Sequence, residues 1–298
     1  MRTALERAIG RDLSSKDKLE RFLDDELGFA VAGTYGGNTS CVEIDAGGEE
    51  YVLCDLGTGV REFGGRYLGQ GNPAKRTVFN VFMSHPHWDH IMGFPFFAPA
   101  YRPGHRIRIH GCHENLEAVF RGQNAAPSFP VDFSELAGTI EFVTLEPGRS
   151  YDIAGLCVRA MRQYHAGDSY GYRFERDGKA VVYSTDSEHR LDHPEEAEPF
   201  VAFFKDADLV IFDAMYSLGD VASVKADWGH SSNVIGVELC HRAGVKHYCM
   251  FHHEPMHDDA RLHAILQETI RYEEINEERA RPERMRVSTA YDGMEIEI

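Results

Sequence analysis

Residues 77–90 read TVFNVFMSHPHWDH, an apolar run that ends in a cluster of polar side chains. The run is rich in β-branched and aromatic residues, which predicts a buried strand. His85, His87, Asp89 and His90 follow it at once. Imidazole nitrogen and carboxylate oxygen are ligands that Zn²⁺ accepts, and a packed core has little use for four such groups together. The stretch therefore predicts a metal site at the end of a strand.

The spacing of these side chains predicts two cations. Positions i and i+2 of an extended chain point the same way, so His85 and His87 converge on one ion. Asp89 and His90 then turn toward a second ion. More ligands must come from other loops at the same edge of the fold.

Three later stretches offer such ligands, each at the end of a predicted strand. His165 follows 156–163, Asp186 closes 179–186, and His252 closes 245–252. A carboxylate such as Asp186 can bridge two cations with its two oxygens. His253 adjoins His252 and is the alternative ligand at this strand end.

Composition limits the class of protein. The 298 residues are 43% hydrophobic, enough for one large α/β domain, and carry a formal charge of -17. Such a charge repels nucleic-acid backbones, so we expect a small anionic substrate and neither tRNA nor another nucleic acid polymer. No run has the length of a signal peptide or membrane span, which favours a cytoplasmic protein without membrane contact. The six scattered cysteines indicate reduced thiols. A homodimer is compatible with this composition.

The pattern of the chain predicts one α/β domain at 29–298, preceded by a charged helical extension at 1–28. Predicted strands cover 40–44, 50–56, 76–84, 105–111, 139–145, 156–163, 170–176, 179–186, 207–214, 245–252, 285–290 and 294–298. Predicted helices cover 60–68, 114–122, 195–205, 232–244 and 258–279. Hairpins and helical crossovers both occur, which indicates two mixed sheets packed on each other with helices outside.

The order of motifs resembles the metallo-β-lactamase-fold hydrolase superfamily over residues 33–298. The motifs are DLGTG at 55–59, HPHWDH at 85–90, the lone His165, STD at 184–186 and FHH at 251–253. The resemblance implies an αββα sandwich with a dinuclear centre. It assigns one cation to His85, His87 and His165, the other to Asp89, His90 and His252, and makes Asp186 the bridge. Zinc is the first expectation for both cations, with manganese or iron as alternatives.

Two further residues have alternative interpretations. Asp55, before Gly57, either accepts a hydrogen bond from a ligand histidine or bonds backbone amides as a turn residue. His230 precedes Ser231 and Ser232, which are good N-cap residues, so it either meets an anionic oxygen at a helix N-terminus or packs there.

The stretch GHSS at 229–232 resembles the phosphate-contacting motif of the phosphodiesterase branch, which includes ribonuclease Z. The glycine- and proline-rich arm of ribonuclease Z has no counterpart here, which also argues against tRNA. The leading hypothesis is a phosphodiesterase for a small, cyclic or nucleotide-like phosphodiester, attacked by a hydroxide between the cations. Asp89, Asp186 and His230 are its proposed catalytic residues.

Alternative hypotheses keep the metals and change the reaction. An ester, thioester or lactone hydrolase would use a tyrosine such as Tyr164 or Tyr216 as oxyanion donor. An iron-dependent oxidoreductase would need only the first three ligands, and a non-catalytic binding module would need none of the chemistry. An aromatic-rich insert at about 94–135 is interpreted as a pocket wall, a dimer contact or core. Its arginines, Arg102, Arg106 and Arg121, are candidate phosphate contacts.

Overall fold

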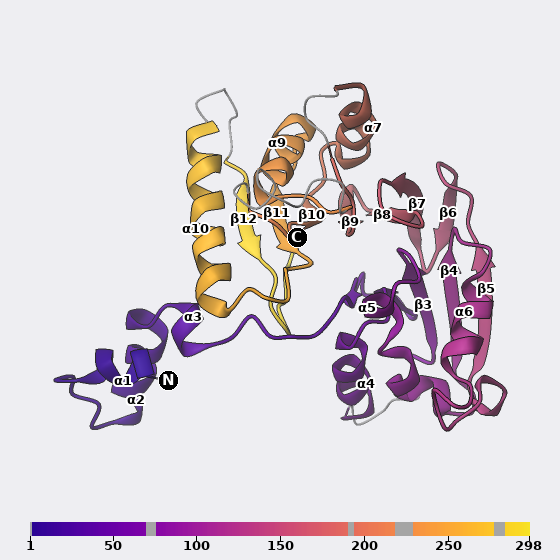
Figure 1. Cartoon of the computed structure of the whole chain (residues 1–298), viewed down its shortest axis with the longest axis horizontal. Coiled ribbons are helices and arrows are strands. Elements are labelled where there is room, and N and C mark those ends of the chain that lie inside the picture. The colour runs from indigo at the N-terminus through magenta and orange to yellow at the C-terminus, as the bar shows by residue number, and fades with distance from the viewer. Residues whose placement is uncertain (1, 70–75, 190–193, 218–228, 277–283) are drawn as a thin grey trace.

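Two mixed β-sheets form the centre of the molecule (Figure 1), a computed structural model that describes residues 2–69, 76–189, 194–217, 229–276 and 284–298. The first sheet has the order β1-β2-β3-β4-β5, with β1 antiparallel to β2 and the others parallel. Its strands are β1 (Val42–Glu43), β2 (Tyr51–Cys54), β3 (Val78–Met83), β4 (Arg106–Gly111) and β5 (Thr139–Thr144).

The second sheet has the order β12-β11-β10-β9-β8-β7-β6. Strands β9 to β12 are parallel, and β6 to β9 form an antiparallel meander. The strands are β6 (Ser150–Ile153), β7 (Leu156–Gln163), β8 (Ser169–Arg176), β9 (Lys179–Ser184), β10 (Leu209–Asp213), β11 (His247–Phe251) and β12 (Arg286–Thr289). Two antiparallel steps separate β7 from β9, so β7, β9, β10 and β11 all run in one direction.

Helices cover the outer face of each sheet (Figure 1). On the first sheet lie α4 (Gly59–Gly69), α5 (Trp88–Ile91), η2 (Phe94–Phe96), η3 (Ala98–Tyr101), α6 (Leu116–Gln123) and η4 (Phe133–Glu135). On the second lie α7 (Pro194–Phe204), α9 (Asn233–Ala243) and α10 (Asp259–Asn276). Ser232 caps α9 by accepting a hydrogen bond from the Ile235 amide, and Gly244 ends it in the left-handed conformation.

Alternation along the strands creates three core layers. In β3, Phe79, Val81 and Met83 pack under the helices of the first sheet, whereas Phe82 points toward the second sheet. In β10, Val210 and Phe212 join the helix-facing core, and Leu209 and Ile211 join the core between the sheets. Helices, sheet, sheet and helices follow one another, so the predicted αββα sandwich is confirmed.

A buried hydrogen bond joins the two sheets. Tyr183 of β9 donates from its hydroxyl to Asp55 Oδ2, which follows β2, at 2.7 Å. Both side chains are fully buried. The neighbouring Tyr172 of β8 crosses the same interface and donates to the backbone carbonyl of Met83 at 2.7 Å. The sheets are therefore held in register by directed polar contacts as well as by apolar packing.

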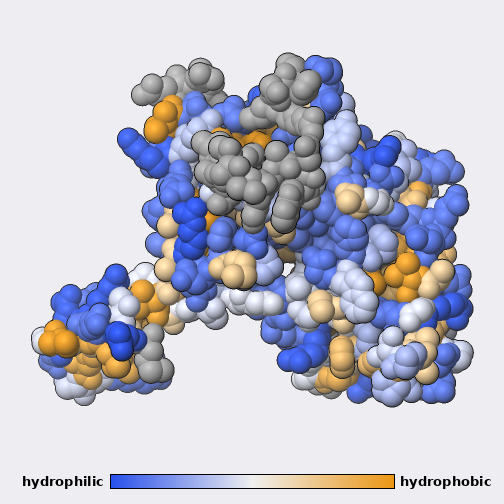
Figure 2. Space-filling model, in the orientation of Figure 1, coloured by the Kyte–Doolittle hydropathy of each residue, from blue (hydrophilic) through white to orange (hydrophobic). Residues whose placement is uncertain are grey.

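The N-terminal residues form α1 (Arg2–Ala8), α2 (Lys16–Arg21), η1 (Phe22–Glu26) and α3 (Phe29–Ala32). These helices lie apart from the first sheet, near the base of α10 (Figure 1). Figure 2 shows hydrophobic residues gathered on them, and Leu5 and Ile9 are exposed. Asp259 of α10 accepts a hydrogen bond from the Tyr35 amide at 2.8 Å. The division into 1–28 and 29–298 stays a prediction.

The predicted strands differ from the observed ones in two places. A closing strand at 294–298 was wrong, because the alternation there reflects Met294 and Ile296 packing on the core between the sheets, and those residues join no ladder. Strand β6 was not predicted, since its four residues have only a short, weak alternation. Among the described residues, no helix combines the length and apolarity needed to cross a bilayer.

We expect Tyr183→Phe to lower the free energy of unfolding more than Tyr172→Phe does. The first substitution removes a donor to a buried carboxylate, which contributes about 1.5–3 kcal/mol, and the second removes a donor to a neutral carbonyl, about 0.5–1.5 kcal/mol. Urea unfolding followed by circular dichroism measures both. Equal losses in the two variants would show that the hydrogen bond from Tyr183 to Asp55 contributes no more free energy than the one from Tyr172 to the Met83 carbonyl.

Candidate metal centre

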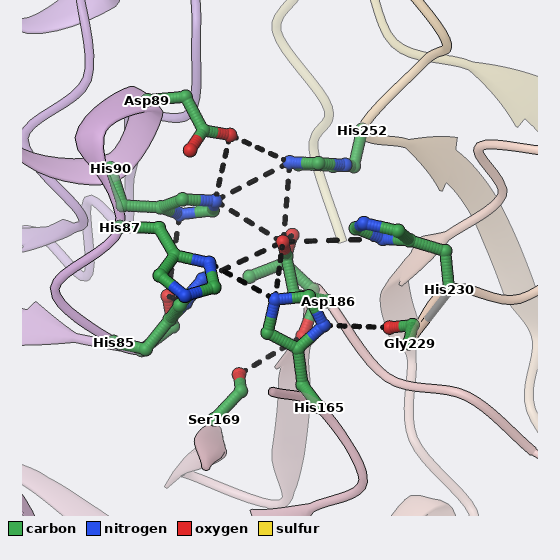
Figure 3. Close-up of polar contacts among 12 residues, drawn as sticks. His85, His87, Asp89, His90, His165, Ser169, Asp186, Gly229, His230 and His252 are labelled. Carbon is green, nitrogen blue, oxygen red and sulfur yellow. Dashed lines mark hydrogen bonds and ion pairs between the residues drawn. The ribbon is translucent and has the colours of Figure 1, made fainter. Parts of the chain in front are cut away.

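All four ligand-bearing loops leave the carboxyl ends of strands. The loop after β3 carries His85 to His90, and the loops after β7, β9 and β11 carry His165, Asp186 and His252. Figure 3 shows these side chains pointing toward one another. The structure therefore brings together the seven metal ligands predicted from sequence, as two groups that meet at Asp186.

The first group consists of His85, His87 and His165. His165 Nε2 lies 3.1 Å from His87 Nδ1, and the two rings flank the buried His85. His165 Nδ1 lies 2.8 Å from the Gly229 carbonyl, and donation there leaves Nε2 with its lone pair toward the group. Gly229 has φ +82°, and a Cβ on it would lie 2.6 Å from His165 Nδ1. A side chain at position 229 would thus displace a ligand histidine.

The second group consists of Asp89, His90 and His252. His252 Nε2 lies 3.0 Å from Asp89 Oδ2 and 3.3 Å from His90 Nε2. His90 Nε2 in turn lies 3.1 Å from Asp89 Oδ2. Three ligand atoms from two loops therefore surround one point.

Asp186 divides its two oxygens between the groups. Oδ1 lies 3.2 Å from His90 Nε2 and 3.3 Å from His252 Nε2, whereas Oδ2 lies 3.6 Å from His85 Nε2 and 3.7 Å from His165 Nε2. This is the arrangement that a bridging carboxylate requires, with one oxygen for each cation.

The residues fit two divalent cations. Two atoms that each lie about 2.1 Å from a tetrahedral zinc ion are about 3.4 Å apart, close to the 3.0–3.7 Å separations within each group. His85 Nε2 is buried at the meeting point and makes no hydrogen bond, an arrangement that is costly unless a ligand is bound there. The all-nitrogen and oxygen donor set suits zinc, manganese or iron.

The ionisable groups of the cluster also favour a bound cation. Burial lowers the pKa of His85 and His87, so both imidazoles stay neutral with lone pairs to offer. Burial opposes charge on His90 as well, but Asp186 and Asp55 raise its pKa well above the usual value. The carboxylates thus attract positive charge to the centre, which divalent cations would supply.

Asp55 holds His90 in place, as one of its two interpretations predicted. Its Oδ2 lies 2.7 Å from His90 Nδ1, and its carboxylate also accepts from the Ser84 amide at 2.7 Å and the Ser84 hydroxyl at 2.6 Å. With the proton of His90 on Nδ1, Nε2 is the free ligand atom. Ser84 Oγ is also 3.0 Å from His85 Nδ1, so the same network orients a ligand of each group.

Three residues of the centre have left-handed backbone conformations. Asp55, Asp186 and His252 have φ values of +59°, +48° and +56°, and each follows a central strand. Such conformations are unfavourable for non-glycine residues and concentrate at functional sites. Here they turn each side chain back toward the ligand cluster.

His230 lies at the edge of the centre, and its partner was missed from the sequence. His230 Nδ1 is 2.9 Å from Asp213 Oδ2 and 4.0 Å from Asp186 Oδ2, and its ring stacks on His252 at 5.2 Å. Asp213 ends β10 and is fully buried. The available signal was the third apolar strand to end in aspartate, VIFD, after VLCD and the STD motif.

Other predicted residues lie outside the cluster. His253 turns away, with Nε2 at 3.1 Å from the Ala290 carbonyl, which favours His252 as the ligand. Tyr216 is buried, with its ring 6.0 Å from His230, while Tyr164 is exposed. Arg106 and Arg121 pair with Glu141 and Glu117.

The aromatic insert is mainly core. Phe94, Phe97 and Phe120 are buried under the helices of the first sheet, while Phe96 is exposed. Of the three interpretations given to this segment, core packing therefore describes most of its rings.

The αββα sandwich and the cluster of histidine and aspartate side chains at its edge define the class of protein as a metallo-β-lactamase-fold protein with a candidate dinuclear metal centre. The chain belongs to the beta-lactamase superfamily, because the model of the Beta-lactamase superfamily domain matches residues 50–253. This is the superfamily that the sequence motifs resemble, and that resemblance is confirmed.

Curated relatives are all named ribonuclease Z. The protein of Haloarcula marismortui is 30% identical over 149 residues, which cover 48% of this chain and 43% of that protein. The chain thus matches less than half the length of this relative. Three further proteins, from Oceanobacillus iheyensis, Thermoplasma acidophilum and a Bradyrhizobium species, are 19–25% identical and carry the same name.

Solved structures share the fold. The metallo-beta-lactamase fold protein YhfI from Bacillus subtilis has a TM-score of 0.63 and 18% identity, covering 88% of this chain and 95% of that chain. The short form of human tRNase Z has a TM-score of 0.55 and 19% identity, covering 72% of this chain and 86% of that chain.

These relatives contradict the exclusion of nucleic acid. The expectation of a small-molecule partner, with no tRNA or other nucleic acid polymer, was wrong because it rested on the formal charge of -17 and on a missing arm. The net charge of the whole chain repels a polyanion only at long range, and salt screens that repulsion beyond about 8 Å. Contacts at the centre depend on local charge, and that centre is built to hold cations.

We expect His252→Ala to lower the bound metal by about one equivalent, because it removes a ligand atom from the second group. His253→Ala is the matched control and should keep the full metal content, since its ring bonds a backbone carbonyl instead. Mass spectrometry of the dialysed proteins measures both. A loss confined to the His253 variant would mean that the ligand is the neighbouring histidine.

Proposed function

We propose that the protein is a dinuclear metal-dependent phosphodiesterase acting on nucleotide-type phosphodiesters, RNA included. The observation that carries the proposal is the carboxylate of Asp186, which presents one oxygen to each ligand group. The ribonuclease Z relatives favour phosphorus over carbon as the electrophile. The second ligand group favours this reaction over oxidation at a single three-histidine site.

His85, His87 and His165 would hold one cation, Asp89, His90 and His252 the other, and Asp186 both. Bound there, divalent cations supply Lewis acidity toward a phosphoryl oxygen and make water more acidic. The protein's own contribution is to orient three of the seven side chains in advance: His90 through Asp55, His85 through Ser84, and His165 through the Gly229 carbonyl.

His230 is suited to protonate the leaving oxygen. Asp213 accepts from Nδ1, which leaves Nε2 as the nitrogen that can donate to substrate. Burial disfavours charge on the ring, but Asp213 outweighs it and raises the pKa of His230. In the reaction water loses a proton and its oxygen bonds to phosphorus, the ester P–O bond breaks, and the proton of His230 Nε2 passes to the departing alkoxide. The proton released by the water returns to His230 through solvent and restores the acid.

We expect the protein loaded with Zn²⁺ or Mn²⁺ to hydrolyse bis(p-nitrophenyl) phosphate and to lose at least about 100-fold in kcat on Asp186→Ala, because the variant loses the shared ligand. Release of p-nitrophenol measures the rate, and p-nitrophenyl acetate serves as the counter-substrate. Turnover of the acetate alone would replace the phosphodiesterase proposal with that of an ester hydrolase. A short RNA assayed in parallel tests whether polymers are accepted.

We expect His230→Ala to lower kcat about 10²–10⁴-fold with metal content unchanged, the range of a general acid. The raised pKa keeps His230 protonated at higher pH, so activity should fall above the ordinary histidine value of about 6.5. Asp213→Asn removes the charge that raises this pKa, so the alkaline limb of the kcat/KM profile should move to lower pH. A limb that stays in place would exclude His230 as the acid.

A further inference from the structure

Three large apolar side chains of the ligand loop face solvent. Trp88, Met92 and Phe96 are 74%, 37% and 58% exposed, and we call them the α5 patch. They recur every four residues along α5 and η2, and the Met92 amide donates to the Trp88 carbonyl at 2.8 Å. Trp88 and Met92 therefore share one face of this helical turn, whereas Phe96 ends the following 3-10 turn, where its amide donates to the Gly93 carbonyl at 2.9 Å. The other rings of this segment, such as Phe94 and Phe97, are buried.

Trp88 is the member of the α5 patch that adjoins the metal centre. Its chain neighbours are His87, of the first ligand group, and Asp89, of the second. Consecutive Cα atoms are about 3.8 Å apart, so the indole is rooted where the two groups meet. His87 is itself exposed, which places this border at the open side of the centre. The backbone of Trp88 therefore lies at the open rim of the ligand cluster, which an entering substrate must cross.

A partner that covered this ring would gain free energy, because burial removes the apolar surface of the indole from water. A second copy of the chain is a poor candidate, since a standard interface covers about 800 Å² on each partner and the α5 patch has only three side chains. A flat ring is a better match. Indole offers a broad π face on which any nucleobase can stack.

We propose that Trp88 stacks on the base attached to the scissile phosphodiester and is a specificity-determining residue for nucleotide substrates. The proposal rests on the proposed function, because it assumes that a phosphodiester occupies the centre. Stacking tolerates every base, so Trp88 selects nucleotides over simple alkyl phosphodiesters without selecting one base. The base belongs either to a small nucleotide or to RNA, since both present the same ring.

The test compares thymidine 5′-(p-nitrophenyl phosphate) with ethyl p-nitrophenyl phosphate, which share a leaving group and differ in the base. We expect Trp88→Ala to lower kcat/KM for the thymidine ester about 5- to 100-fold, chiefly through KM, because stacking is uniform binding. The ethyl ester should change less than about twofold, and Trp88→Phe should restore most of the preference. Met256→Ala, at another exposed apolar residue, is the matched control and should change neither substrate.

A short single-stranded RNA assayed in parallel identifies the source of the base. A loss with the thymidine ester supports a small nucleotide as a sufficient partner, and a loss with RNA alone supports stacking on a polymer base. Equal losses on the thymidine and ethyl esters would overturn the proposal, because Trp88 would then act only through the metal loop. No effect on any substrate would overturn it too.

A binding measurement separates this proposal from the proposed function. The chain has two tryptophans, so thymidine 5′-monophosphate should quench part of the intrinsic fluorescence, and Trp88→Phe should abolish that quench. If no phosphodiester is hydrolysed but the quench depends on Trp88, the proposed function fails and base recognition stands. If diesters are hydrolysed without any such quench, the base-stacking proposal fails alone.

Discussion

The buried carboxylate of Asp55 is the contact on which the centre depends. It receives hydrogen bonds from the Ser84 amide and hydroxyl, from His90 and from Tyr183, so one side chain of the first sheet binds the ligand loop and the second sheet at once. A fully buried carboxylate is costly unless its oxygens are satisfied, and four donors satisfy this one. The distance between sheets and the orientation of His90 are thus set by the same group.

The layered architecture explains how four distant segments deliver seven candidate ligands. Strands that run in one direction end at one edge, so β3, β7, β9 and β11 all release their following residues near the same place. Apolar alternation fixes each strand in the sandwich, and the first polar residue beyond it becomes a ligand or a partner of one. The core therefore positions the chemistry.

Much of this arrangement is visible in the sequence, because it rests on periodicity and on local spacing. Alternating apolar runs identify most strands, and the histidine cluster after β3 identifies the ligand loop. Pairings across the fold are not local, so Tyr183 as a donor to Asp55 and Asp213 as the partner of His230 emerge only in three dimensions. Net charge was a poor guide to the class of substrate, because it sums charges over the whole chain and does not describe the local charge at the ligand cluster.

The left-handed residues at the strand ends place side chains at the centre and lower the stability of the fold. Asp55, Asp186 and His252 each adopt a backbone conformation that costs roughly 1–3 kcal/mol for a side chain with a Cβ, and glycine would relieve it. Glycine at Asp186 or His252 would relieve the strain and remove a candidate metal ligand, whereas glycine at Asp55 would also remove the hydrogen bonds that join the two sheets. At Asp186 and His252, selection for thermal robustness alone would therefore act against the site, and a sequence optimised for rigidity would drift toward an inert protein.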